Sequence, residues 1–474
     1  MYAPLFRKVL FPLYETALRR RRTLHYLDEY EASQWLPAEQ VEALQWAKLQ
    51  ALVRHCWDQV PYYRQAWSAA GVRAPGDIAS VADFGALPVL RKQDVRTHFE
   101  SLKARDHRGR LLYKTTGGST GEPLTIGYTR ESYERRVAAM FRGYAWAGAA
   151  AGTRTLYLWG RPGDALRERL HHAAFNRRML DVYPMSDDNM GAYADAIDRH
   201  RPEAIVAYAS SVVRLSRWLL ERGRTVHAPR SVLCAAEPLH GYQRELIARA
   251  FGCEVFNTYG CREFMLLASE CAHGGLHVNA DHLRLELGQA HAGAPVADGG
   301  PARTRQEVLV TDLHNYGMPL VRYANGDLAT PRAGCCPCGR GLPMLAQVDG
   351  RSMDALRSPQ GHYVGEYLEH LVFATPGVRR FQAVQSRIDE IDVRIVRGEG
   401  FDEASTGCIR ERMREAYGDG LRLRFAYPQD IPLTATGKLR VAVSRLSAAA
   451  AAYAAQLEEL VFSSGIAQAA TAVA

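Results

Sequence analysis

Short apolar runs alternate with amphipathic stretches through the middle of the chain. Strands are predicted for four of the apolar runs, at 153–159, 204–208, 231–236 and 253–257. Helices are predicted between them, where apolar positions recur with helical spacing, at 189–200, 211–223 and 241–252. Strands that alternate with helices over short connections form a mostly parallel sheet flanked by helices. We therefore expect an α/β fold that binds its ligands beyond the carboxyl ends of the strands.

The pattern changes after about residue 283, where β-rich runs are broken by glycine and proline. A break near Gly350–Asp354 precedes a region with predicted strands and one helix, at 378–385, 390–396, 402–417 and 421–427. We expect a large N-terminal domain with a β-rich subdomain, followed by a small α+β domain. The predicted boundaries are 1–40 for a basic helical extension, 41–350 for the large domain, 351–447 for the small domain and 448–474 for an alanine-rich helix and tail.

The first 22 residues combine apolar positions at helical spacing with a basic run. The six bases, which stand against the single acid Glu15, are Arg7, Lys8, Arg19, Arg20, Arg21 and Arg22. Such a helix can lie on a membrane surface. Pro4 and Pro12 are expected to interrupt it, and an apolar face packed on the large domain explains the pattern equally well. Packing and peripheral membrane contact both stay open at this point.

Composition excludes several classes of protein. The chain has 474 residues, of which 47% are hydrophobic and 23% charged, as in globular proteins with more than one domain. No run approaches the roughly 20 apolar residues of a membrane-spanning helix, and no secretory signal is recognisable, so we expect a cytoplasmic protein. Residues 1–22, with six bases and one acid, carry +5 of the net charge of +8. The rest is nearly balanced, so nucleic acid is not an expected partner, whereas a homodimer is left open.

The strongest local motif is a loop rich in glycine and hydroxyl residues, which precedes a predicted strand. It runs from Thr115 to Pro123 and contains Thr115, Thr116, Gly117, Gly118, Ser119, Thr120 and Gly121. Backbone N–H groups and hydroxyls with little side-chain bulk around them can bind phosphate oxygens. No Gly-Lys-Ser/Thr follows, so the loop is not a Walker P-loop, and a plain surface turn is the alternative.

Four more motifs follow in the chain: Asn257–Glu263 (NTYGCRE), Tyr323–Asp327 (YANGD), Gly350–Asp354 (GRSMD) and Thr434–Arg440 (TATGKLR). Together with the loop, and in this order, they resemble the adenylate-forming superfamily of acyl-CoA synthetases, in particular its phenylacetate–CoA ligase-like branch. The resemblance spans residues 40–445. It implies an AMP-binding domain with a mobile C-terminal domain, ATP-dependent activation of a carboxylic acid to an acyl-adenylate, and transfer of the acyl group to CoA.

The resemblance assigns roles to individual residues. The loop Thr115–Gly121 holds the phosphates of ATP, and Glu263 helps to hold magnesium, a hard cation that suits carboxylate oxygens. Asp327 binds the ribose hydroxyls, although Asn325 stands where the family usually has threonine. Arg351 contacts phosphate or ribose. The other expected nucleotide-binding residues are Ala236, Glu237, Asn257, Tyr259 and Gly260.

Lys438 is the expected catalytic residue of the small domain. In the family, the matching lysine reaches the reacting carboxylate and the α-phosphate. An ammonium on a flexible stem fits between two anions better than a planar guanidinium does. The residue type is informative here, because only 6 of the 59 basic residues in this chain are lysines.

The second half-reaction is less well defined by the sequence. In the family, the small domain rotates about a hinge, usually Asp or Lys, two residues after the boundary arginine. Here that position is Met353, followed by Asp354, and no basic CoA patch is obvious. Transfer of the acyl group to an amine, a hydroxyl or a carrier protein is therefore the alternative to CoA. The substrate is expected to be a small carboxylic acid, and Trp159 and Tyr208 are candidates for its pocket or for plain core packing.

Cysteine and histidine gather in two places, around residues 271–277 and 335–338. Four such ligands make a closed tetrahedral zinc site, which is structural and not catalytic. Members of the branch that the sequence resembles carry Cys-rich metal knots in this region. The preferred ligand set is Cys271, His277, Cys336 and Cys338, with His273 and Cys335 as alternates. Buried or incidental thiols are the other interpretation.

Overall fold

The computed structural model describes residues 2–115, 124–160, 166–182, 184–185, 188–291, 305–351, 356–359, 364, 368, 371–372, 375–417, 419–432, 439 and 441–446. Contacts within the chain divide it into two units. Unit 1 comprises Met1–Leu287, Val308–Asn325 and Pro331–Val348, and unit 2 comprises Gly288–Glu307, Gly326–Thr330 and Asp349–Ala474. The sequence-based boundaries assign 288–307 and 326–330 to the large domain, whereas the contacts group these segments with the C-terminal part.

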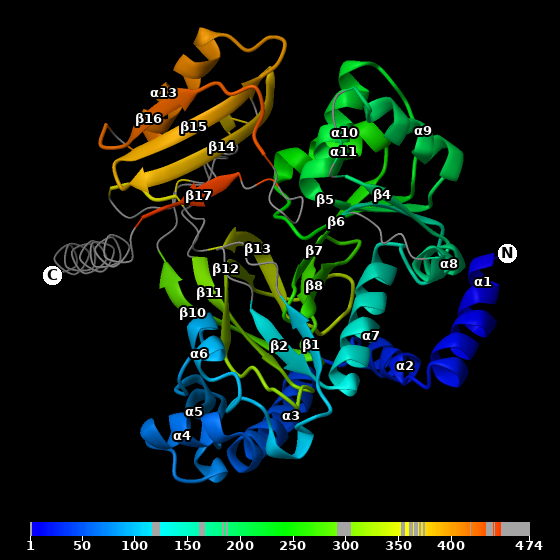
Figure 1. Cartoon of the computed structure of the whole chain (residues 1–474), viewed down its shortest axis with the longest axis vertical. Coiled ribbons are helices and arrows are strands. Elements are labelled where there is room, and N and C mark those ends of the chain that lie inside the picture. Colours follow the sequence, from blue (N-terminus) through cyan, green and yellow to red (C-terminus); the bar gives the residue numbers. More distant parts are fainter. Residues whose placement is uncertain are drawn as a thin grey trace. The chain divides into compact units, whose positions relative to one another are not determined.

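An 11-stranded sheet is the framework of the fold, and the predicted α/β class is confirmed (Figure 1). Its strand order is β10-β11-β12-β13-β9-β8-β7-β6-β5-β3-β4. In chain order the strands are β3 (Thr155–Trp159), β4 (Arg177–Asp181), β5 (Ala204–Tyr208), β6 (Ser231–Ala235), β7 (Glu254–Cys261), β8 (Met265–Glu270), β9 (Leu276–Val278), β10 (Leu283–His291), β11 (Arg305–Asp312), β12 (Tyr323–Arg332) and β13 (Met344–Arg351).

The strands β4, β3, β5, β6 and β7 are neighbours and run parallel. The chain passes from β3 to β4 on one side and then to β5 on the other, so the direction of winding reverses between β3 and β5. Ligands of such sheets bind beyond the strand ends at this point. Trp159 and Tyr208 end β3 and β5, and their ring centroids lie 4.2 Å apart. Both rings also pack on the core of the parallel half.

Helices connect the parallel strands as the apolar pattern predicts. They are α8 (Leu166–Ala174), α9 (Met190–His200), α10 (Ala209–Glu221) and α11 (Gly241–Phe251). The predictions for 189–200, 211–223 and 241–252 correspond to α9, α10 and α11. Strand β4 was not predicted, because Arg177 and Arg178 begin it and leave only a short apolar run. The strand forms because it pairs with β3, although its own apolar pattern does not predict a strand.

The other elements of unit 1 come from the N-terminal part of the chain. The hairpin of β1 (Leu112–Thr115) and β2 (Thr125–Tyr128) forms a separate two-stranded sheet. The α-helices are α1 (Tyr2–Leu5), α2 (Thr23–Ser33), α3 (Ala38–Gln59), α4 (Pro61–Ala69), α5 (Val81–Gly85), α6 (Lys92–Thr97) and α7 (Arg130–Trp146). Among the residues described, every helix is too short or too polar to cross a bilayer.

The first segment is helical through both of its prolines, so the expected interruption is wrong. After α1, residues Phe6–Leu10 and Leu13–Leu18 are π-helical, and Phe11 N–H donates to the carbonyl of Phe6, five residues earlier. Proline normally breaks an α-helix because it has no N–H and its ring meets the carbonyl four residues earlier. In this segment the helix is wider than an α-helix on each side of Pro12.

Unit 2 contains a four-stranded sheet with the order β16-β15-β14-β17. Its elements are β14 (Val378–Arg387), β15 (Glu390–Arg397), α13 (Glu403–Tyr417), β16 (Arg422–Ala426) and β17 (Ala442–Ser444). Inward residues of β14 and β15 pack with Ile409 and Met413 of α13 in a core of their own. The elements predicted for 378–427 are confirmed, whereas the predicted alanine-rich helix at 448–474 lies outside the described residues.

Candidate functional site

The hairpin of β7 and β8 carries most of the nucleotide-binding residues that the sequence predicts. Asn257, Tyr259 and Gly260 lie on β7, and Glu263 lies in the turn before β8. Because β7 is parallel to β6 and antiparallel to β8, this turn follows the carboxyl end of the last parallel strand. That edge of the sheet is where ligands bind in α/β folds.

Two hydrogen bonds fix Glu263. Its side chain is only 4% exposed, and its Oε1 accepts a hydrogen bond from the Tyr323 hydroxyl at 3.2 Å. Its backbone carbonyl accepts one from Nη1 of Arg136 at 2.6 Å. A buried carboxylate is costly unless it has hydrogen bonds, a counter-charge or a metal. The arrangement therefore presents one carboxylate, in a defined position, at the ligand-binding edge of the sheet.

The shape of the turn explains the glycine of the motif. A β-bulge separates Tyr259 from Gly260, and a Cβ atom on Gly260 would lie 2.3 Å from the carbonyl oxygen of Met265. No side chain fits at that distance. Met265 itself has a φ of 64°, a conformation that is uncommon for a non-glycine residue. Such backbone geometry is often found at functional sites.

A buried ion pair lies behind Glu263. Nη2 of Arg136, on α7, lies 2.7 Å from Oδ2 of Asp312, and the two side chains are almost fully buried. Ser132 donates a further hydrogen bond to the same oxygen. Burial alone would raise the pKa of Asp312, but the influences of Arg136, His282 and His314 together outweigh it and hold that pKa below the ordinary range. One guanidinium therefore neutralises Asp312 and also holds the backbone of Glu263.

Asn325 connects the second motif to the hairpin. Its Nδ2 donates to the hydroxyl of Tyr259 at 2.8 Å, and both side chains are buried. The substitution of asparagine for the usual threonine therefore has a local function, since the longer amide side chain reaches the tyrosine. Asp327 lies farther along β12, beyond the point where this strand passes into unit 2.

Lys114 is a charged residue of this region that was not predicted. It lies near the end of β1, just before the glycine-rich loop. Burial lowers its pKa, as do the charges of Arg262 and Arg136, whereas Glu263 acts in the opposite direction. These influences show that the ammonium is near the Glu263 turn. The signal in the sequence is a rare lysine directly before the loop motif.

The base of the loop is closed by its own strands. Thr115 pairs with Thr125 in the β1–β2 hairpin, and their Oγ1 atoms lie 3.3 Å apart. The hydroxyl of Thr115, which was predicted to bind phosphate, is thus shared with a neighbouring strand. Several predicted site residues lie outside the described residues: Thr116, Gly117, Gly118, Ser119, Thr120, Gly121 and Lys438. Arg351 ends β13, and its side chain is also outside them.

Glu237 has a structural partner. Its carboxylate accepts hydrogen bonds from the backbone N–H of Ser210 at 2.7 Å and from the Ser210 hydroxyl at 3.0 Å. It therefore caps the N-terminus of α10 in the manner of an N-terminal acid. Ala236 has a φ of 66°, which places a strained residue directly after β6. Both residues follow a central parallel strand, as expected for the edge of a ligand site.

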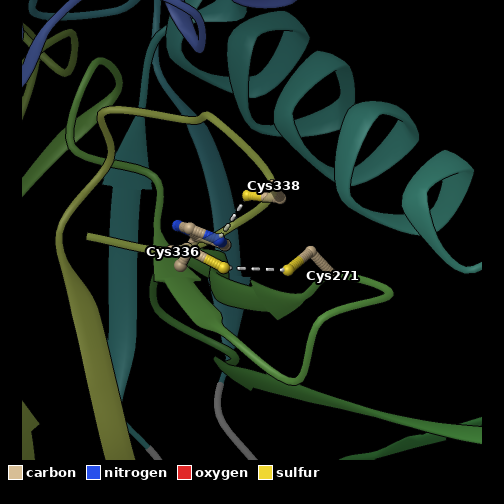
Figure 2. A group of neighbouring side chains, drawn as sticks. Cys271, Cys336 and Cys338 are labelled. Atoms are coloured by element: carbon tan, nitrogen blue, oxygen red, sulfur yellow. Dashed lines mark hydrogen bonds between the residues drawn. The ribbon is translucent and has the colours of Figure 1, made fainter. Parts of the chain in front are cut away.

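The four preferred zinc ligands lie together. Strand pairing brings them into contact, because Met344 of β13 is opposite His277 of β9 and the loops before these strands then lie side by side. Figure 2 shows the thiols of Cys271, Cys336 and Cys338 facing one another. Cys271 and Cys336 have sulfurs 3.6 Å apart, and Cys338 Sγ is 3.2 Å from Nε2 of His277. The alternates His273 and Cys335 are not in this group.

The geometry of the four residues fits a tetrahedral metal. Their ligand atoms all lie within 4.8 Å of one another, and a tetrahedron with Zn–S bonds of ~2.3 Å has edges of about 3.8 Å. Nδ1 of His277 lies 3.1 Å from the carbonyl of Leu342, so it can donate to that oxygen and direct Nε2 toward the sulfurs. Burial lowers the pKa of His277, which keeps its ring neutral at pH 7.

Gly275 leaves the space that the group needs. A Cβ atom at this position would lie 2.9 Å from each of three atoms, Sγ of Cys336, Nε2 of His277 and Sδ of Met344. A side chain at position 275 would therefore collide with two of the four candidate ligands, and none of the three cysteines is in a disulfide.

Comparisons with known proteins agree with this description. Residues 356–445 match the family model of the CapK C-terminal domain. The phenylacetate–coenzyme A ligase of Thermus thermophilus is 27% identical over 436 residues, which cover 85% of this chain and 96% of that protein. Protein CapK of Staphylococcus aureus is 23% identical over 388 residues, which cover 78% of this chain and 82% of that protein.

A solved structure shares the fold over nearly the whole length. The 2-hydroxyisobutyryl-CoA ligase, in the postadenylation state with an adenylate bound, has a TM-score of 0.66 at 18% identity. The alignment covers 90% of this chain and 94% of that chain. The fold and the relatives together confirm the resemblance seen in the five motifs. Over most of its length the chain is therefore similar in sequence to phenylacetate–coenzyme A ligases, and it shares its fold with an acyl-CoA ligase.

Proposed function

We propose that the protein is an AMP-forming acid–thiol ligase, which activates a small carboxylic acid with ATP and transfers the acyl group to CoA. The observation that carries the proposal is the buried Glu263 carboxylate, fixed by Tyr323 at the carboxyl edge of the parallel strands. It is supported by relatives named phenylacetate–coenzyme A ligase that cover most of the chain. Because ATP and CoA are supplied in the cytoplasm, we infer that the protein works there.

Different residues would bind the metal, the phosphates and the ribose in the first half-reaction. One carboxylate, together with phosphate oxygens, is the usual set of ligands for magnesium, and Glu263 supplies that carboxylate. When bound, magnesium neutralises charge on the phosphates. Thr116, Ser119 and Thr120 of the loop would bind phosphate oxygens, and Asp327 would accept hydrogen bonds from the ribose. Fixed donors and cations of this kind stabilise the charge that develops on the phosphoryl oxygens.

Two observations support an acceptor other than CoA as the alternative. Met353 occupies the hinge position, and the small domain, which would direct the acceptor, matches a CapK model. The alternative is an enzyme that forms the same acyl-adenylate and passes the acyl group to an amine, a hydroxyl or a carrier protein.

An assay of pyrophosphate release over a panel of aryl, fatty and amino acids, with and without CoA, tests both proposals. We expect release with at least one acid, together with an acyl-CoA product when CoA is present. Release with no acyl-CoA product would favour the alternative acceptor. No release with any acid, from protein that still binds ATP, would contradict both.

We also propose that Cys271, His277, Cys336 and Cys338 bind one structural zinc ion. Four protein ligands fill a tetrahedral site and leave no open position for catalysis. The ion would join two loops that are 65 residues apart in the chain, the separation of Cys271 and Cys336. Its expected role is to stabilise the sheet edge formed by β9 and β13, and not to take part in the reaction.

We expect about one equivalent of zinc in purified protein, because the four ligands make a single closed site. Cys336→Ser should remove most of the zinc and lower the thermal unfolding midpoint by at least about 5 °C, because metal binding contributes to folding free energy. Metal analysis and thermal unfolding measure the two effects.

Cys335→Ser is the matched control for this experiment. Cys335 is the adjacent residue and also a cysteine, but it is exposed and outside the ligand group. Its substitution should leave zinc content and the unfolding midpoint unchanged. A folded wild-type protein without zinc, or equal losses from the two substitutions, would contradict the assignment.

A further inference from the structure

The helical segment 2–18 is a fixed part of unit 1. Phe6 and Phe11 are buried, and their rings pack edge-on against Phe175 and Phe141, with centroids 5.0 and 5.3 Å apart respectively. Gly152 leaves room for this contact, because a Cβ atom there would lie 2.5 Å from the Phe6 ring. The segment is therefore seated on the body of the protein by one of its faces.

Another face of the same segment exposes a row of large apolar side chains to solvent. The exposed fractions are 52% for Leu5, 51% for Val9, 61% for Leu13 and 73% for Leu18. Successive members are four or five residues apart, which is about one turn of a helix whose hydrogen bonds join residues five apart. They therefore follow one side of the segment. We call these four residues the apolar row.

Helix α8 extends this surface. The Tyr2 hydroxyl donates to the carbonyl of Ala174, and the rings of Tyr14 and His171 have centroids 6.3 Å apart, so α8 lies beside the segment (Figure 1). Leu166 and Leu170, one turn apart on α8, are also largely exposed. Scattered exposed leucines are ordinary on a protein surface, but four large apolar side chains along one side of a helix are not scattered, and such a row indicates an interaction site.

The exposed charges within residues 2–22 are all basic. Glu15 is the only acid of residues 2–22, and it is buried, with its Oε1 3.2 Å from Arg21. Lys8, Arg20 and Arg22 are exposed. The one exposed acid described on α8, Glu168, lies 3.8 Å from His172. An exposed apolar row with basic residues beside it is complementary to a surface that is apolar inside and anionic at its boundary.

We propose that the apolar row and its basic neighbours bind the surface of an anionic lipid bilayer. Leu5, Val9, Leu13 and Leu18 enter the boundary between headgroups and acyl chains, while Lys8 and Arg20 contact the lipid phosphates. The buried phenylalanines keep the segment attached to unit 1, so lipid binding holds the whole unit at the membrane. The packed face and the lipid-binding face are different faces of one helix, which reconciles the two interpretations that the sequence left open.

Sedimentation of the full-length protein with vesicles tests the proposal. Wild-type protein should bind phosphatidylcholine vesicles that contain phosphatidylglycerol at least about tenfold more tightly than pure phosphatidylcholine vesicles. At about 1 M salt, where the Debye length is ~3 Å, this preference should disappear. The double variant Lys8→Gln/Arg20→Gln should weaken binding about fivefold for each charge removed.

Removal of the apolar row is the second arm. Leu5→Ser/Val9→Ser/Leu13→Ser should weaken vesicle binding at least about tenfold while the rate of pyrophosphate release is unchanged. Val81→Ser, which removes an exposed apolar side chain from α5, is the matched control and should bind vesicles like the wild type. Circular dichroism confirms that each variant is folded, and the salt dependence of wild-type binding needs no substitution.

Three results would overturn the proposal. One is wild-type protein that stays in the supernatant with anionic vesicles. Another is a triple variant that is folded and binds vesicles as well as the wild type. The third is a wild-type dimer in analytical ultracentrifugation that the triple variant cannot form, together with absence of vesicle binding, since a second copy would then cover the row.

Discussion

Replacing Lys438 with alanine is expected to lower acyl-adenylate formation at least about a hundredfold, the scale of losing one key electrostatic contact to a transition state. The proposed role is to place a positive charge between the substrate carboxylate and the α-phosphate as they react. That charge matters most in the transition state, so kcat should fall more than KM rises. Single-turnover measurement of pyrophosphate release, with the acid identified by the panel, gives the rate of this step.

Two comparisons separate this role from a general loss of structure. Arg445→Ala, which removes an exposed base from the same small domain, should leave adenylation within about threefold of wild type. The Lys438→Ala variant should also convert a chemically synthesised acyl-adenylate to product at nearly the wild-type rate, because the proposed role of the lysine is confined to the first half-reaction. Near-normal adenylation by Lys438→Ala would contradict the assignment.

Much of the fold could be predicted because local pattern and long-range structure agree in it. The central strands and the helices α9, α10 and α11 have apolar positions at the period of their own element, so a short window suffices. Strand β4 has no such pattern and depends on its neighbour β3. The continuity of the N-terminal helix through Pro12 was not predicted for a related reason, since contacts of Phe6 and Phe11 with the body stabilise what local propensity opposes.

The candidate site shows the same division. Motif residues such as Glu263 could be named from the sequence because their types and order are chemically specific. Their supports could not, because Arg136, Tyr323 and Asp312 come from distant parts of the chain and meet only when the sheet forms. Cys336 was preferred over Cys335 from the sequence, and the structure places the Cys336 sulfur 3.6 Å from that of Cys271, with Cys335 outside the group.

Asp312→Asn is expected to lower the free energy of unfolding by about 3–5 kcal/mol, because it leaves the Arg136 guanidinium buried without its counter-charge. The pKa of Asp312 in the folded protein is below its ordinary value of about 3.9. The pair therefore contributes its full stability above about pH 4 and loses it as the pH falls below that value. Urea unfolding at pH 7.5, followed by tryptophan fluorescence, measures the difference.

Asp312→Asn should also affect the candidate nucleotide-binding site. Arg136 holds the backbone of Glu263, so an arginine without its partner should shift the proposed magnesium ligand and raise KM for magnesium–ATP in protein that is still folded. Asp195→Asn is the matched control, because Arg224 and Asp195 form a similar contact at 2.8 Å but are exposed. Loss of that pair should cost at most about 1 kcal/mol. Equal losses of unfolding free energy from the two substitutions would contradict the idea that burial makes the Arg136–Asp312 pair more important than an exposed pair. An unchanged KM for magnesium–ATP would show that the pair does not control the position of Glu263.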